Sequence, residues 1–181
     1  SVGSTHVLGV KTDGSLWSWG YGSYGQLGHG SSSFKRTPTR IGTANDWLAV
    51  EAGYEHSLAL KTTGTLWAWG NNGSGRLGDG TTTNRNVPIQ VGTSNQWMAI
   101  SAGSGHSLAL RMDGSLWAWG ANAGGQLGDS TNETRNSPVP IAAGSTWKSM
   151  SAGFSHSLAL RSDDTLWAWG GNWLGQLGLG D

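Results

Sequence analysis

Histidine–serine pairs are the residues of this sequence whose types most directly suggest chemistry. They occur at His56-Ser57 and again 50 and 100 residues later. A serine hydroxyl activated by an imidazole base is the nucleophile of many hydrolases. Adjacent residues of an extended strand point to opposite faces, however, so the two side chains of one pair do not meet. The nearest carboxylate, Asp113, lies about 23 Å along the strand from His106. The sequence therefore predicts no catalytic site and no enzyme.

The histidines could also form a metal site, because neutral imidazole is a common metal ligand. Each histidine shares its strand face with two apolar residues, which instead points it into a core between repeating units. We expect each ring to bond a backbone group at the start of its strand. A structural role is therefore predicted for His6, His56, His106 and His156, while His29 is expected in a solvated loop. We predict neither a metal nor another cofactor.

A repeat of 50 residues positions these side chains. Two tryptophans in every unit follow the same spacing, and their identical placement indicates a packing role: Trp17, Trp19, Trp67, Trp69, Trp117, Trp119, Trp167 and Trp169. The chain holds about 3.6 repeats without insertions. We divide residues 1–181 into one array with units 1–50, 51–100 and 101–150, and an incomplete unit 151–181.

Composition excludes several classes of protein. The 181 residues include 11 basic and 11 acidic side chains, so we expect no basic surface for nucleic acid. The 31 glycines disfavour a helical domain and the 12 tryptophans disfavour disorder. Cysteine is absent, and no apolar run has the length of a membrane span, so we expect no membrane association. The start at Ser1 rather than methionine predicts processing or excision from a longer chain.

Each unit is predicted to form four short strands. In the second unit these are 47–52, 56–61, 65–69 and 87–91, and the Asp13-Gly14 pair of the first unit is typical of a hairpin turn. His56, Leu58 and Leu60 share one face of the second strand. Such sheets suit stacking on copies of themselves. The fold class is therefore all-β, with four-stranded antiparallel blades arranged as a β-propeller and a linear stack as the alternative.

The repeated motif resembles a known family. The second unit reads Ala-Gly-Tyr-Glu-His-Ser-Leu-Ala-Leu over 52–60, Leu-Trp-Ala-Trp-Gly over 66–70 and Gly-Arg-Leu-Gly over 75–78. It is similar to the regulator of chromosome condensation repeat, in a tryptophan-rich form that resembles bacterial members. The resemblance implies seven blades around a central channel. The chain then forms half a propeller, completed by a dimer that closes a ring or by a longer parent chain; a self-closed monomer is the third possibility.

Residues that break the repeat are the candidates for function. Loops at one end of the strands carry bulky or charged residues where sister units have small or polar ones: Tyr21, Tyr24, Tyr54, Glu55, Phe154 and Trp173. Exposed aromatic side chains on loops are typical anchors for partners. We therefore predict a non-enzymatic scaffold that binds a protein partner, as the resemblance also implies, since the family includes protein inhibitors. The alternatives are a self-assembling half-propeller, a lectin that uses Tyr24 and Trp173, and loop variation without function.

Overall fold

Strands, turns and irregular loops make up residues 1–180, which are the residues described by the computed structural model. Fourteen strands form four antiparallel sheets, which we call blades 1 to 4. Blade 1 contains β1 (His6–Val10), β2 (Leu16–Gly20) and β3 (Lys35–Arg40). Blade 2 contains β4 (Trp47–Ala52), β5 (His56–Lys61), β6 (Leu66–Gly70) and β7 (Arg85–Gln90).

Blade 3 repeats this order with β8 (Trp97–Ala102), β9 (His106–Arg111), β10 (Leu116–Gly120) and β11 (Arg135–Ile141). Blade 4 consists of β12 (Trp147–Ala152), β13 (His156–Arg161) and β14 (Leu166–Gly170). The predicted all-β class and the four-stranded antiparallel sheets in repeats of about 50 residues are confirmed.

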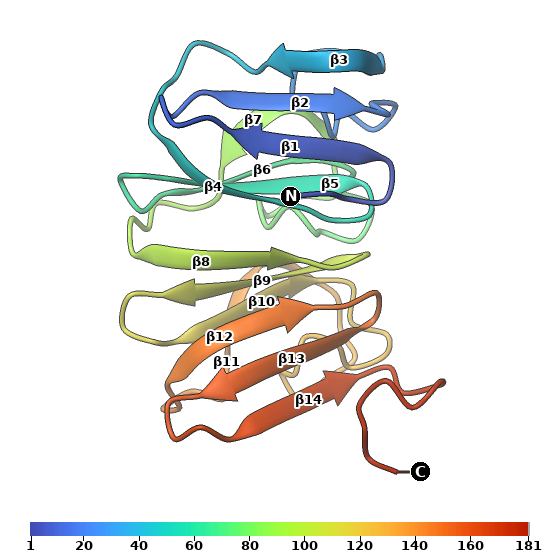
Figure 1. Cartoon of the computed structure of the whole chain (residues 1–181). Helices are drawn as coiled ribbons and strands as arrows, with labels where there is room; N and C mark the ends of the chain where they lie inside the picture. Colours follow the sequence, from blue (N-terminus) through green and yellow to red (C-terminus); the bar gives the residue numbers. More distant parts are fainter. Residues whose placement is uncertain (181) are drawn as a thin grey trace.

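The blades follow one another from blade 1 at one end of the array to blade 4 at the other (Figure 1). The first strand of each blade packs against the second strand of the preceding blade, as β4 does against β1 and β8 against β5. The inner strand β8 also contacts both β4 and β12, so the first strands lie nearest the common axis. In blade 1 the place of a first strand is taken by a single bridge between Val2 and Val7.

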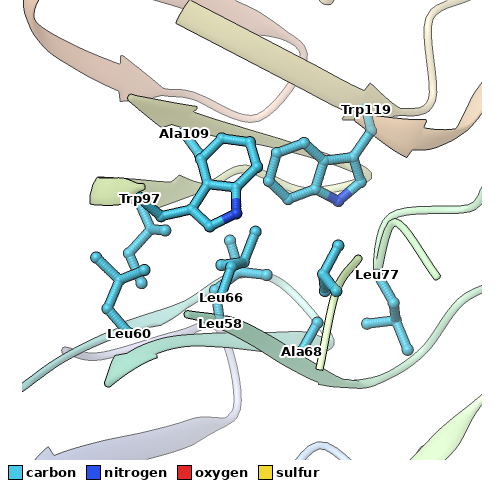
Figure 2. Packing of buried hydrophobic residues seen from close by; sticks show 10 residues of the cluster. Leu58, Leu60, Leu66, Ala68, Leu77, Trp97, Ala109 and Trp119 are labelled. Atoms are coloured by element: carbon cyan, nitrogen blue, oxygen red, sulfur yellow. The ribbon is translucent and has the colours of Figure 1, made fainter. Parts of the chain in front are cut away.

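The blades are held together by leucines of one blade against tryptophans of the next. Between blades 2 and 3, Leu58, Leu66 and Leu77 pack beneath Trp97 and Trp119 (Figure 2). The Trp119 side chain is completely buried. Burial of an indole of this size contributes on the order of 5 kcal/mol of hydrophobic free energy. We call each such interface between consecutive blades a joint.

A cation covers the outer tryptophans of each joint. The guanidinium of Arg111 lies 4.7 Å from the ring of Trp97 and 4.0 Å from that of Trp117. Lys61 and Arg161 occupy the equivalent places in blades 2 and 4. These cation–π contacts shield the indoles from solvent at the blade edge and add to the packing energy.

Glycine is required where blades approach most closely. A Cβ atom at Gly103 would lie 2.6 Å from the carbonyl oxygen of Gly153 and 2.5 Å from the ring of His106. Gly78 has a φ of 76°, and a Cβ there would lie 2.8 Å from Nε1 of Trp119. The repeated glycines of both motifs therefore maintain the spacing between blades.

The hairpin turn of blade 4 differs in sequence but not in conformation. Asp164 replaces the glycine found at position 114 and has a φ of 69°, close to the 78° of Gly114. A residue other than glycine is strained in this left-handed conformation, which aspartate tolerates better than most side chains.

We predict that Gly103→Ala destabilises the fold by about 1–3 kcal/mol, because the added methyl group collides with a neighbouring backbone that has no free space. The matched control is Gly9→Ala, which adds the same group where no atom lies within 4 Å and where sister blades have alanine. Urea denaturation of both variants measures the difference. Equal stability of the two would contradict the close-approach argument.

Candidate functional site

The histidine and serine side chains meet across the joints, not within a unit. Nε2 of His6 lies 2.9 Å from Oγ of Ser57 in the next blade. The same distance separates His56 from Ser107 and His106 from Ser157. The expectation of a backbone partner for the imidazole is therefore wrong for His6, His56 and His106, because the partner is a serine hydroxyl 51 residues further along the chain.

The hydrogen bonds around Ser57 determine where the protons lie. Its hydroxyl donates to the carbonyl oxygen of Gln26 at 2.8 Å, so Nε2 of His6 must be the donor toward Ser57. Nδ1 of His6 then carries no proton, and no described group bonds it. The serine is completely buried. A buried serine whose proton is already bound to a carbonyl is a structural link, not a nucleophile.

Burial also determines the charge of the imidazoles. It lowers the pKa of His6 and of His106 to about 4. The pKa of His56 is likewise far below its ordinary value, first through burial and then through the nearby charge of Arg76. These rings are therefore neutral at physiological pH. Within residues 1–180 no three histidine or carboxylate side chains gather closely enough to hold a metal ion. That part of the chain also has no helix long and apolar enough to cross a membrane.

The turns after the inner strands converge on the axis and line a hollow of about 270 Å³. Tyr54 of blade 2 and Phe154 of blade 4 meet beside it, with ring centroids 5.9 Å apart and planes at 80°. Both rings remain accessible, at 44% and 69% of their surface. The sister positions are Ser4 and Ser104, so packing of the repeat does not require an aromatic residue here.

The other predicted partner-binding residues lie on the turns and loops at the same end of the strands. Glu55 follows Tyr54 and accepts a hydrogen bond from Nδ2 of Asn71 at 2.8 Å. The backbone amide of Tyr21 donates to the carbonyl of Thr5, which places Tyr21 beside the inner turn of blade 1. Tyr24 is in the same loop as Tyr21, with its amide bonded to the side chain of Gln26. We call the end of the array that carries these turns and loops the loop face.

Trp173 occupies the loop face of blade 4. It is 74% exposed and lies near Gly124 and Gly171. Within the described chain, no ring-to-ring contact joins it to Tyr54 or Phe154. Trp173 and Tyr24, the two residues of the lectin alternative, belong to blades 4 and 1.

Arg76 is a residue of the loop face that our sequence analysis missed as a candidate. It replaces the glutamine found at positions 26, 126 and 176. Its guanidinium donates to the carbonyl of Ser104 at 3.0 Å and interacts electrostatically with Glu55. Burial lowers the pKa of Arg76, and its Nε has no partner among the described residues. The arginine in place of the repeated glutamine was the feature of the sequence from which this candidate could have been identified.

Four-stranded antiparallel blades stacked around a common axis define this chain as part of the β-propeller class. The family profile described as the RCC1-like domain matches residues 1–181, so the chain belongs to the RCC1-like domain family. The resemblance to regulator of chromosome condensation repeats is confirmed.

Solved structures show the same fold. Human WBSCR16 is similar with a TM-score of 0.89 and 27% identity, over 99% of this chain and 49% of that protein. Prp20p from Saccharomyces cerevisiae has a TM-score of 0.78 and 26% identity, over 92% of this chain and 42% of that protein. Yeast RCC1 (Prp20) bound to Kap60 gives a TM-score of 0.79 at 24% identity, over 92% of this chain and 40% of that one. The chain thus spans less than half of each of these proteins.

A curated relative matches a shorter region. Human E3 ubiquitin-protein ligase HERC2 is 42% identical over 41 residues, which is 23% of this chain and 1% of that protein, and the protein from Mus musculus gives the same values. The chain therefore spans a very small part of these relatives.

We predict that acidification lowers the free energy of unfolding between about pH 6.5 and pH 4. The unfolded histidines, with ordinary pKa values near 6.5, take up protons in this range, whereas the folded His6 and His106, with pKa values of about 4, do not. Stability is therefore complete above this range and is lost as the pH falls, by on the order of 2 kcal/mol per histidine at about pH 5.

Urea denaturation at a series of pH values measures this loss, and the interval from about pH 7 to 9 is the internal control, where stability should stay level. A free energy of unfolding that stays constant down to about pH 5 would show that the histidines are not buried in the neutral form.

Proposed function

We propose that the chain is a non-enzymatic scaffold that binds a protein partner through its loop face. The observation that carries this proposal is the exposed contact between Tyr54 and Phe154 beside the axial hollow. Two large aromatic groups in van der Waals contact form a rigid apolar surface that loses little side-chain entropy on binding. Since Ser4 and Ser104 serve the fold equally well at the sister positions, the aromatic rings are available for a partner.

The surroundings of this pair support a protein as the partner. The described loop face is rich in tyrosine, serine, glycine and asparagine, which is the composition of antibody binding loops. Arg76 and Glu55 supply one charge of each sign near the aromatic pair. Related propellers bind proteins: yeast RCC1 (Prp20) was solved bound to Kap60, and the structure of Prp20p was described with its binding properties to Gsp1p and histones. The buried, proton-donating serines support a role without catalysis.

We predict that the double variant Tyr54→Ser and Phe154→Ser weakens partner binding at least about tenfold, since it removes the central aromatic contact of the interface. Both substitutions install the residue of sister blades, so the fold is retained. A photo-cross-linking amino acid at position 54 identifies the partner in the cells that make the protein, and calorimetry with that purified partner measures the affinity.

The matched control is on the opposite end of the blades. Met112 is exposed in the hairpin between β9 and β10, where sister units have threonine or serine. Met112→Thr should leave the affinity unchanged, and a cross-linker at position 112 should capture no partner. Cross-linking only from position 112, or unchanged affinity of the double variant, would disprove binding through the loop face.

A second candidate function is self-assembly, which the outer face of blade 4 favours. Leu166 is 70% exposed there, whereas the equivalent Leu66 and Leu116 are completely buried by the next blade. A further blade of the same kind would cover it, supplied either by a second copy that closes a ring or by a longer propeller. We predict a dimer of the 181-residue chain, detected by light scattering over a hundredfold range of concentration. A mass of 18.9 kDa throughout would exclude the dimer.

A further inference from the structure

Arg76, in the loop between β6 and β7, lacks a hydrogen bond that its sister residues make. In the sister loops the glutamine side chain accepts a hydrogen bond from the backbone amide two positions earlier, at 2.8–3.0 Å; the pairs are Gln26 with Tyr24, Gln126 with Gly124 and Gln176 with Leu174. A guanidinium has no acceptor atom, so this bond across the loop cannot form in blade 2. Arginine is therefore not the residue that best stabilises the loop.

The positive charge of Arg76 is half-buried and has no ion pair. None of the four ion pairs within residues 1–180 includes it. Glu55 attracts the guanidinium without forming an ion pair, and its carboxylate accepts a hydrogen bond from Asn71. Burial lowers the pKa of Arg76, because the charged form is disfavoured away from water. Such a charge costs stability unless a further carboxylate reaches it.

The outer end of the guanidinium has hydrogen-bond donors to spare. Nη1 of Arg76 donates to the carbonyl oxygen of Ser104 at 3.0 Å, and Nη2 lies 3.5 Å from Oγ of Ser74. Each Nη nitrogen carries a second N–H group, for which residues 1–180 provide no partner. A carboxylate is the group that a guanidinium binds most strongly through such donors.

Arg76 also lies beside the aromatic pair. Ser104, whose carbonyl holds the guanidinium, lines the axial hollow together with Tyr54 and Phe154. Tyr24 of blade 1 is near enough to act electrostatically on Arg76. Blade 2 is packed against blade 1 on one side and blade 3 on the other, so blades added at either end of the array would not pack on its sheet.

We propose that the protein partner of the loop face presents an aspartate or glutamate side chain to Arg76, next to the apolar group that packs on Tyr54 and Phe154. This inference rests on the proposed function and specifies the chemistry of the partner. The carboxylate would pair with the Nη atoms, since Nε is enclosed. It would compensate the charge that the free chain leaves unpaired, and a residue that costs stability in the free protein is typical of a binding site.

The variant Arg76→Gln tests whether the fold needs the arginine. The substitution installs the residue of the sister loops and restores an acceptor for the amide of Ser74. It leaves the main-chain carbonyl that accepts hydrogen bonds from Ser107 and Trp119. The urea concentration at the midpoint of unfolding should therefore rise. A midpoint that does not rise would show that the arginine serves the fold, and would overturn the proposal.

A library of random peptides displayed on phage is the probe for the carboxylate. Peptides selected on the wild-type chain should be rich in aspartate or glutamate near an aromatic or aliphatic residue. Their synthetic forms should bind Arg76→Gln about tenfold more weakly, as measured by calorimetry. Arg76→Lys, which keeps the charge but not the planar fork, should give an intermediate affinity. Raising the salt concentration from about 0.05 to 1 M should weaken binding to the wild type more than to Arg76→Gln, because salt screens the charge pair.

Gly105 offers an internal competitor with a matched control. It occupies in blade 3 the place that Glu55 has in blade 2. A Cβ atom at Gly105 would lie 3.9 Å from Nη2 of Arg76 and 3.2 Å from Cβ of Ala121, a contact that both variants share. Gly105→Glu should pair with the arginine from within the chain and weaken the acidic peptides about tenfold. Gly105→Gln, of the same size but without charge, should leave their affinity nearly unchanged, and circular dichroism verifies that both variants fold.

The outcomes separate this proposal from the function on which it builds. If the selected peptides show no excess of acidic residues, or bind Arg76→Gln and Gly105→Glu as tightly as the wild type, the acidic contact is disproved. The aromatic interface then stands or falls with the Tyr54 and Phe154 variants alone. If acidic peptides lose affinity on Arg76→Gln but not on the double serine variant, the acidic contact holds and the aromatic interface is disproved.

Discussion

One backbone carbonyl in each of blades 1 to 3 is the acceptor on which the joint to the next blade depends. The carbonyl of Gln26 accepts hydrogen bonds from the indole of Trp69 and the hydroxyl of Ser57, and that hydroxyl in turn accepts a hydrogen bond from Nε2 of His6. Four polar groups of two blades are thereby hydrogen-bonded inside a mainly apolar interface. Since a buried polar group without a partner costs about 1–3 kcal/mol, the set holds one relative position of the two blades against all others. Burial of the leucines and tryptophans contributes most of the free energy of blade packing, and the hydrogen bonds fix the position of one blade relative to the next.

Because the acceptor is a main-chain atom, the side chain at the same position is free to change. Arg76 provides the acceptor for Ser107 and Trp119 as well as glutamine does, while its guanidinium reaches Ser104 of the next blade. The turns at the axis have the same freedom, with serine, tyrosine or phenylalanine after the required glycine. The loop face can therefore vary without loss of the fold, which is the property expected of a scaffold whose partner is recognised by substitutions in otherwise equal units.

The sequence alone predicted the features that depend on local alternation. The 50-residue spacing predicts the number of blades in the chain. Because Leu58 and Ala59 point to opposite faces of the strand, the sequence also predicts which face of a blade carries the leucines that pack on the next blade. Contacts between units could not be predicted in this way. The bond from His6 to Ser57 joins residues 51 positions apart, and the meeting of Tyr54 with Phe154 depends on how strongly three consecutive blades curve around the axis. Arg76 was visible as a break in the motif, but its partner Ser104 follows only from the packing of blade 3 on blade 2.

Within residues 1–180 the buried clusters lie between consecutive blades, with Tyr54 and Phe154 as an exposed contact between blades 2 and 4, and this affects how the chain loses its structure. Blades 2 and 3 each take part in two joints, whereas blades 1 and 4 take part in one. In such a linear array the stability is close to a sum over units and nearest-neighbour interfaces. Within residues 1–180, slow amide hydrogen exchange should therefore be concentrated in β5 and β9, whose blades have a joint on both sides.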